Sequence, residues 1–168
     1  MRTSLRTLVA GAALVVAATF TAPAANAQIG FVVQGSYGLD SKDFGVGAGL
    51  NFGLGSMTAN SGISAEATFD YFFAEDPLKY WEINGNALYD IRSIRGLYVG
   101  AGVNYAHASY SDGDANFCDI DGVSCSSSDV GLNVLSGYKF SGGKGPFVQA
   151  RFAIGGADQL YLTGGFRF

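Results

Sequence analysis

The residues best suited to chemistry gather in one stretch of the sequence, between positions 107 and 125. His107 is the only histidine of the chain, and Ser109 follows two positions later. Residues two apart on a β-strand point to the same face, so these side chains would lie together. A histidine beside a serine can act as the base that activates the hydroxyl as a nucleophile. The spacing therefore makes His107 and Ser109 candidate catalytic residues.

The two cysteines, Cys118 and Cys125, lie in the same stretch. An isolated pair in an oxidising compartment is most simply a disulfide, and the further ligands of a metal site are missing around it. We therefore expect a disulfide that closes a ring of eight residues. In the chain-entropy model such a ring stabilises the fold by about 2.5 kcal/mol.

Four aspartates surround the cysteines at alternate positions, with glycines close by. They are Asp112, Asp114, Asp119 and Asp121. Alternating carboxylates are typical of part of a calcium-binding loop, but the closing glutamate of that pattern is absent. The stretch is therefore interpreted as a hydrated acidic surface loop, with a calcium site as the alternative.

The N-terminus has the three parts of a secretory signal peptide. Arg2 and Arg6 form a positive region, 8–20 is apolar, and 25–27 reads Ala-Asn-Ala, a small-residue cleavage pattern. We therefore expect 1–27 to be cleaved and 28–168 to form one domain. Cleavage leaves 8 Lys and Arg against 14 Asp and Glu, a net charge of −6. Nucleic-acid binding is excluded, because it requires clustered basic residues.

The composition of the 168 residues is that of a membrane protein, with 48% hydrophobic and only 14% charged residues. Past residue 27, however, no run of about 18 apolar residues could span a bilayer as a helix. The 25 glycines lack the three-residue period of collagen, and no glycine-rich loop opens a helix as in a nucleotide site. We expect no cofactor.

Apolar residues alternate with small or polar ones at period two, which predicts β-strands. The eight segments are 29–38, 44–54, 63–73, 80–91, 97–107, 130–140, 147–154 and 159–168. Every strand charge shares the face that carries the glycines and asparagines. These charges are Glu66, Asp70, Glu82, Asp90, Lys139, Arg151 and Arg167.

A soluble sandwich would instead carry its charges on an exposed face in quantity. The pattern therefore predicts an all-β fold, an eight-stranded antiparallel up-and-down transmembrane β-barrel with a polar lumen. Eight strands leave a lumen just wide enough for side chains to fill. We expect the charges to form a plug, with Arg151 and Arg167 bridging the acids. A small porin-like ion channel is the alternative.

The predicted external loops are 39–43, 74–79, 108–129 and 155–158. Only the third is long, so we expect any surface ligand to bind through 108–129. The protein would then have a structural or adhesin-like role at the cell surface, with the third loop held by its disulfide.

At the C-terminus, Leu160, Leu162, Phe166 and Phe168 alternate and end in a terminal phenylalanine. This resembles the signal by which the assembly machinery recognises outer-membrane barrels. The whole mature chain resembles the small eight-stranded outer-membrane superfamily, which includes the OmpA transmembrane domain, OmpX and the opacity adhesins. The resemblance implies a bacterial outer-membrane location, with contacts to outer-membrane lipid, lipopolysaccharide and that machinery.

The spacing of His107 and Ser109 is also similar to that in lipid A deacylases, which are eight-stranded barrels. The asparagine that follows the serine there is Tyr110 here. No outward glutamate on the next segment is available to orient the histidine. A protein that is not an enzyme is therefore expected, with lipid A deacylation as the alternative.

Overall fold

The computed structural model describes residues 29–54, 62–74, 78–110, 126–141, 143–155 and 160–168, which form eight strands. The strands are β1 (Ile29–Gly38), β2 (Phe44–Gly53), β3 (Ile63–Phe72), β4 (Leu78–Asp90), β5 (Leu97–Tyr110), β6 (Ser126–Lys139), β7 (Gly145–Ile154) and β8 (Leu160–Arg167). The observed ends differ from the predicted ones by no more than four residues. The described residues contain no helix long and apolar enough to cross a membrane.

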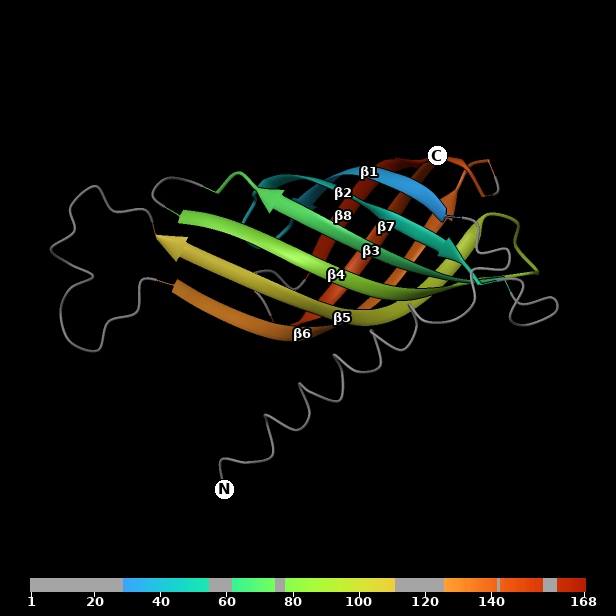
Figure 1. Cartoon of the computed structure of the whole chain (residues 1–168). Helices are drawn as coiled ribbons and strands as arrows, with labels where there is room; N and C mark the ends of the chain where they lie inside the picture. The colour runs from blue at the N-terminus through green and yellow to red at the C-terminus, as the bar shows by residue number, and fades with distance from the viewer. Residues whose placement is uncertain (1–28, 55–61, 75–77, 111–125, 142, 156–159) are drawn as a thin grey trace, which may run out of the picture.

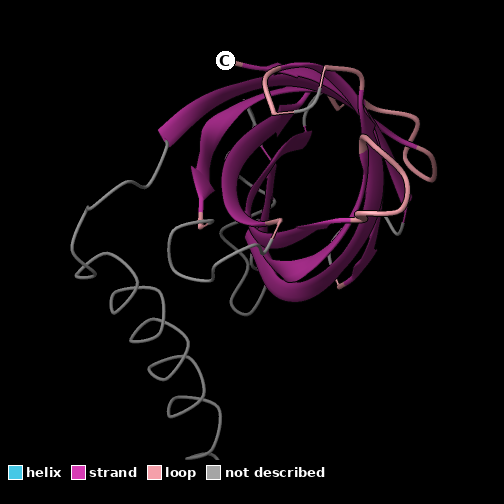
Figure 2. Cartoon of the chain, turned by 90° about the vertical axis from the view of Figure 1, so that its right-hand side faces the viewer, coloured by secondary structure: helices cyan, strands magenta, loops and turns pink. Residues whose placement is uncertain are grey.

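Each strand pairs antiparallel with the next one along the chain, and β1 pairs with β8. The closing register sets Val32 opposite Arg167 and Tyr37 opposite Leu162. Figure 2 shows the strands as a closed ring. The predicted eight-stranded antiparallel up-and-down barrel is therefore confirmed.

The two ends of the barrel differ in length and content. β1 begins and β8 ends at one end, here called the terminal end, and the opposite end is called the loop end. β5 and β6 have 14 residues each and extend past β7 and β8 at the loop end (Figure 1). We call this pair of strands the β5–β6 hairpin.

The predicted bounds of the third loop, 108–129, are wrong. β5 continues to Tyr110 and β6 begins at Ser126, with Ser109 opposite Ser126. The extension consists largely of alanine and serine, so it lacks the large apolar residues by which the other segments were recognised. Backbone pairing with the neighbouring strand maintains it instead.

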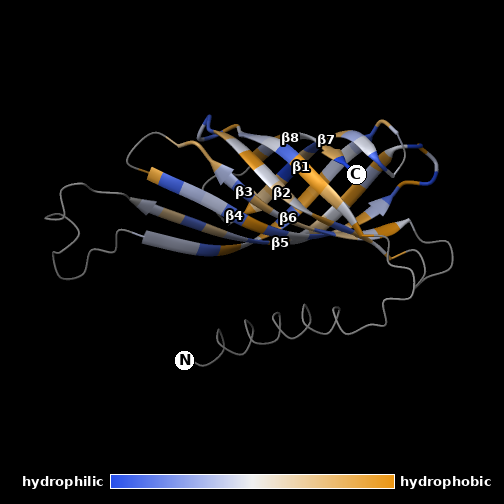
Figure 3. Ribbon diagram, turned by 45° about the horizontal axis from the view of Figure 1, so that its top comes forward, coloured by the Kyte–Doolittle hydropathy of each residue, from blue (hydrophilic) through white to orange (hydrophobic). Residues whose placement is uncertain are grey.

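Large apolar side chains cover the outside of the barrel, and polar ones face the lumen. Phe31 is 64% exposed and Val130 71%, whereas Glu82 is 0% and Asn84 2% exposed. Figure 3 shows hydrophobic and hydrophilic residues alternating along the strands. Burying charge and exposing large apolar groups is unfavourable in water, but it suits a barrel surrounded by lipid.

The lumen also contains large side chains, and the alternation of the sequence did not place some of them, such as Phe72 and Tyr80, on the inward face. One cluster joins Phe72, Tyr80 and Tyr161 toward the loop end. Several of the bulky inward residues lie over a glycine of a neighbouring strand: Phe72 over Gly45, Tyr98 over Gly137 and Phe147 over Gly165. A Cβ at Gly45 would lie only 2.7 Å from the Phe72 ring. The inward glycines therefore accommodate aromatic packing in a narrow barrel.

Candidate functional site

The seven charged residues predicted to face the lumen form three ion pairs and one unpaired carboxylate. Five of them are at least 95% buried, while Asp90 and Lys139 pair at the rim of the terminal end. The Lys139 Nζ to Asp90 Oδ1 distance is 2.5 Å, and the Asp90 side chain is 47% exposed. The two arginines hold the deeper acids.

Toward the loop end, Arg151 of β7 crosses the lumen to Glu82 of β4. Its Nη2 donates to Glu82 Oε2 at 2.6 Å, and its Nη1 donates to the side-chain oxygen of Asn84. The hydroxyls of Tyr80 and Tyr161 both donate to the other oxygen of Glu82. The guanidinium also stacks on the Tyr161 ring at 4.0 Å. The pair is therefore bonded from several strands.

Asp70 lies at the centre of the lumen and is 1% exposed. It accepts hydrogen bonds from Gln34 Nε2 at 2.7 Å, Thr68 Oγ1 at 3.0 Å and Asn84 Nδ2 at 3.1 Å. Among the described residues it has no ion-pair partner within 4 Å. Amide and hydroxyl donors thus replace a cation at this position.

Toward the terminal end, Arg167 of β8 forms a bidentate ion pair with Glu66 of β3. Nε donates to Oε2 at 2.8 Å and Nη2 to Oε1 at 3.2 Å. The guanidinium lies 4.1 Å from the centre of the Phe147 ring and 5.0 Å from that of Tyr98. Its Nη1 is buried with no hydrogen-bond partner among the described residues.

Little space remains between the two arginine layers. A polar cavity lined by Gln34, Asp70 and Arg151, among others, has a volume of about 10 Å³. A cavity of that size can hold about one water molecule. A wider hollow of about 680 Å³ lies at the terminal end, beside Asp90, Lys139 and Arg167. The lumen is thus narrow at its centre and opens toward the terminal end.

The structure does not pair His107 with Ser109. His107 faces outward on β5, opposite Ser128 of β6, and its Nδ1 lies 2.8 Å from Ser128 Oγ. Its ring also lies 5.1 Å from that of Trp81. Among the described residues, no carboxylate forms an ion pair with His107. Ser128 lies before residue 130, where the predicted strand begins, so the alternation of apolar residues did not reach it.

The register across β4, β5 and β6 shows where the apolar outer surface ends. Outward residues form three rows toward the loop end, and each row is more polar than the one before. The rows are Ile83, Tyr105 and Val130, then Trp81, His107 and Ser128, then Lys79, Ser109 and Ser126. Tryptophan favours the membrane–water interface. We call the apolar outward surface, from the row of Ile83, Tyr105 and Val130 toward the terminal end, the lipid-facing belt. The middle row therefore lies at the edge of this belt.

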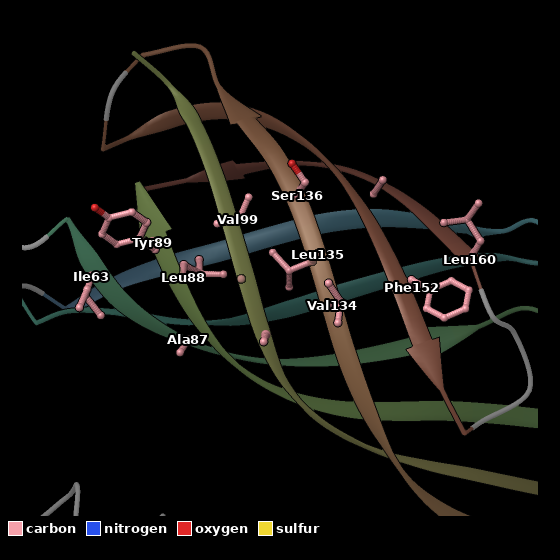
Figure 4. A pocket seen from close by; sticks show the side chains of 13 residues that line it. Ile63, Ala87, Leu88, Tyr89, Val99, Val134, Leu135, Ser136, Phe152 and Leu160 are labelled. Atoms are coloured by element: carbon pink, nitrogen blue, oxygen red, sulfur yellow. The ribbon is translucent and has the colours of Figure 1, made fainter. Parts of the chain in front are cut away.

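A shallow apolar hollow of about 770 Å³ lies on the outer surface across β4, β5, β6 and β7 (Figure 4). Its lining includes the small residues Ala87, Ala101 and Ala150 and the larger Tyr89 and Phe152. Because it lies within the lipid-facing belt, acyl chains would fill it in a bilayer.

Both cysteines and the four loop aspartates lie outside the described residues. The disulfide between Cys118 and Cys125 therefore stays a prediction, as does calcium binding by Asp112, Asp114, Asp119 and Asp121. No cluster of three or more His, Cys, Asp or Glu that could hold a metal ion occurs within the part of the chain that the structure describes.

The closed barrel, its apolar outer surface and its charge-filled lumen define a small eight-stranded barrel of the outer-membrane type. No family model and no curated protein matches the sequence. Among solved structures, the N-terminal β-barrel domain of Pseudomonas aeruginosa OprF is similar, with a TM-score of 0.53 and 15% identity. The match covers 85% of this chain and all of that domain. At this identity the similarity concerns the fold.

Two further solved structures are similar at lower scores. Neisserial surface protein A (NspA) has a TM-score of 0.46 and 14% identity, covering 83% of this chain and 90% of NspA. Ail, the attachment invasion locus protein of Yersinia pestis, has a TM-score of 0.41 and 19% identity, covering 83% of this chain and 95% of Ail.

Proposed function

We propose that this chain is an integral protein of the bacterial outer membrane whose barrel presents the β5–β6 hairpin and its loop to a partner at the cell surface. The observation that carries the proposal is the arrangement of the two faces. Large apolar residues cover the outside, and four of the five buried charges pair inside. Lys79 is the only charged residue at the outward positions of the described strands, and it lies in the outermost row.

The location and orientation are tested together. If 1–27 is cleaved, the intact mass should equal that of residues 28–168. The protein should also fractionate with the outer membrane. The test variant replaces Cys118 and Cys125 by serine and carries Ser126→Cys. Its single cysteine should react with an impermeant maleimide on whole cells. A cysteine at Ser93, in the turn at the terminal end, is the matched control and should react only after lysis. The reverse pattern of labelling would contradict the proposed surface role.

We further infer that the lumen is closed to solutes. The Glu82–Arg151 and Glu66–Arg167 pairs cross it, and the cavity between them is about 10 Å³. In planar bilayers, the purified protein should give no steady conductance. Steady single-channel conductance would favour the alternative, a small porin-like channel.

The outward-facing residues of the barrel suggest two partners. Lipopolysaccharide phosphates would approach Lys79, which stands one row beyond Trp81 at the edge of the apolar belt. The assembly machinery would recognise the C-terminal strand, whose Leu160, Leu162, Phe166 and Phe168 all face outward and are exposed. Replacing Phe168 by serine should therefore lower the amount of assembled barrel in the outer membrane.

Lipid A deacylation is the second candidate, favoured by one observation, the hydrogen bond between His107 and a serine at the belt edge. The bonded serine is Ser128, so this residue would attack the acyl ester while His107 takes its proton and passes it to the departing lipid hydroxyl. Water would then hydrolyse the acyl-serine ester and release the acyl chain as a carboxylic acid. Lipid A from cells that overproduce the protein distinguishes the two functions. An unchanged mass spectrum is expected for the surface role, and loss of an acyl chain that the His107→Ala variant abolishes would favour the enzyme.

A further inference from the structure

One side of β6 has no partner strand where the β5–β6 hairpin extends past β7. Pairing with β5 runs to Ser126, but pairing with β7 begins only at Leu132, opposite Ile154. A Cβ at Gly131 would meet the backbone oxygens of Ile154 and Gly155, so Gly131 still packs against the end of β7. Within the described part of the chain, residues 126–130 therefore form a free strand edge (Figure 1).

A free edge presents alternate backbone N–H and C=O groups that a further strand can bind. Natural edges are commonly protected by lysine, proline or a bulge. Residues 126–130 read Ser-Ser-Ser-Asp-Val, contain neither lysine nor proline, and are all exposed. Their register with β5 runs without interruption from Ser126 to Val130, so no bulge turns the edge away. Among these edge residues the charge of Asp129 is the remaining protective feature, so the edge is open to a strand that places no like charge beside Asp129.

The charge beside this edge indicates what kind of strand it fits. Asp129 is exposed, and its opposite residue on β5 is the buried Ala106. Among the described residues, Asp129 has no ion-pair partner. The remaining side chains are three serines and a valine, which leave room for an approaching backbone.

We propose that the edge at 126–130 binds an extended segment of a partner protein, which adds to β6 as a further strand. Main-chain hydrogen bonds supply the affinity in this mode of recognition, and side chains supply the selectivity. A lysine or arginine of the partner segment lies beside Asp129. The inference rests on the proposed surface role, because it gives the partner of the hairpin its chemistry: an extended, basic polypeptide.

The test uses the mature chain in lipid nanodiscs, with amide hydrogen exchange followed by NMR. The probe is a capped six-residue peptide of alternating threonine and valine with one central lysine, at millimolar concentration. Its control is the same peptide methylated at every backbone nitrogen. Without peptide, alternate amides of 126–130 should exchange fast. The probe should slow them at least about tenfold while the amides of 133–138 stay unchanged, and the methylated control should have no effect.

The contribution of Asp129 is tested by exchanging charges. Asp129→Asn should weaken binding of the lysine peptide about two- to fivefold, the range expected for one cross-strand charge pair. Asp129→Lys should favour the same peptide carrying glutamate in place of lysine. Three results would each overturn the proposal. They are equal binding of the methylated control, no slowing of exchange by the probe, and amides of 126–130 that are already protected without peptide. Cysteine labelling tests the surface role separately, so peptide binding by a hairpin that faces the cell interior would overturn only that role.

Discussion

Replacing Arg151 by methionine should destabilise the barrel strongly, because it leaves a carboxylate buried without its cation. Glu82 is 0% exposed, and the Arg151 side chain is 4% exposed. Removing one partner of a buried pair commonly costs about 3–5 kcal/mol. Glu82 keeps the hydroxyls of Tyr80 and Tyr161 as donors. We therefore expect the lower end, about 3 kcal/mol, which is more than 100-fold in the unfolding equilibrium.

Two further variants isolate the cause of that loss. In the Glu82→Gln/Arg151→Met double variant neither member of this ion pair leaves its charge behind, so most of the lost stability should return. Lys139→Met is the matched control, since it breaks the ion pair at the rim, where the Asp90 side chain is 47% exposed. A pair exposed to water contributes at most about 1 kcal/mol.

The assay is reversible urea unfolding of the barrel in lipid vesicles, followed by the fluorescence of Trp81. Trp81 is the only tryptophan of the chain and lies on the outer face beside Phe69, Tyr105 and His107. Its emission should therefore change when the strand leaves the membrane. The reasoning is refuted if Arg151→Met costs no more than Lys139→Met, or if the double variant is less stable than Arg151→Met alone.

Three other results are expected. Gly47→Ala should destabilise the barrel by roughly 1–3 kcal/mol through overpacking, because its Cβ would collide with a lumen carboxylate, whereas Gly85→Ala has open space and should change little in the same unfolding assay. The unreduced intact mass should be two hydrogens below that of the dithiol form, and a thiol label on both Cys118 and Cys125 would contradict the disulfide. Replacing 108–129 by a short turn removes the loop together with most of the strand edge at 126–130 and should abolish surface binding, and retained binding would place the contact elsewhere.

Much of the fold could be predicted because lipid outside and a narrow lumen inside impose opposite demands on alternate residues. The second strand is the plainest case, with Val46, Ala48 and Leu50 outward and glycines inward. A one-residue slip would turn every charge toward lipid, so parity fixes the register of each strand. Arg151 and Arg167 were expected to hold the acids for the same reason, as the lumen offers few other cations.

The partners of the candidate site could not be predicted, because they depend on which residues of different strands lie opposite each other. Ser128 is 21 residues from His107 in sequence, and only the β5–β6 register brings them together. The large inward residues were missed for a related reason. Phe72 looks like a break in the alternation of its own strand until Gly45, opposite it on β2, is seen to make room.

The lumen and the extended end of the β5–β6 hairpin differ in how many of their polar groups already have a bonding partner. In the lumen, Glu66 and Glu82 are already bound to arginines, and Asp70 is already bound by three donors. A ligand entering there would have to replace bonds that are buried and charge-assisted, which is costly. At residues 126–130 the backbone groups on the β7 side have no partner strand among the described residues, so an added strand can supply main-chain hydrogen bonds there without breaking buried ones. Changes at the exposed end of the hairpin would therefore break few buried bonds, whereas changes among the lumen charges would break several.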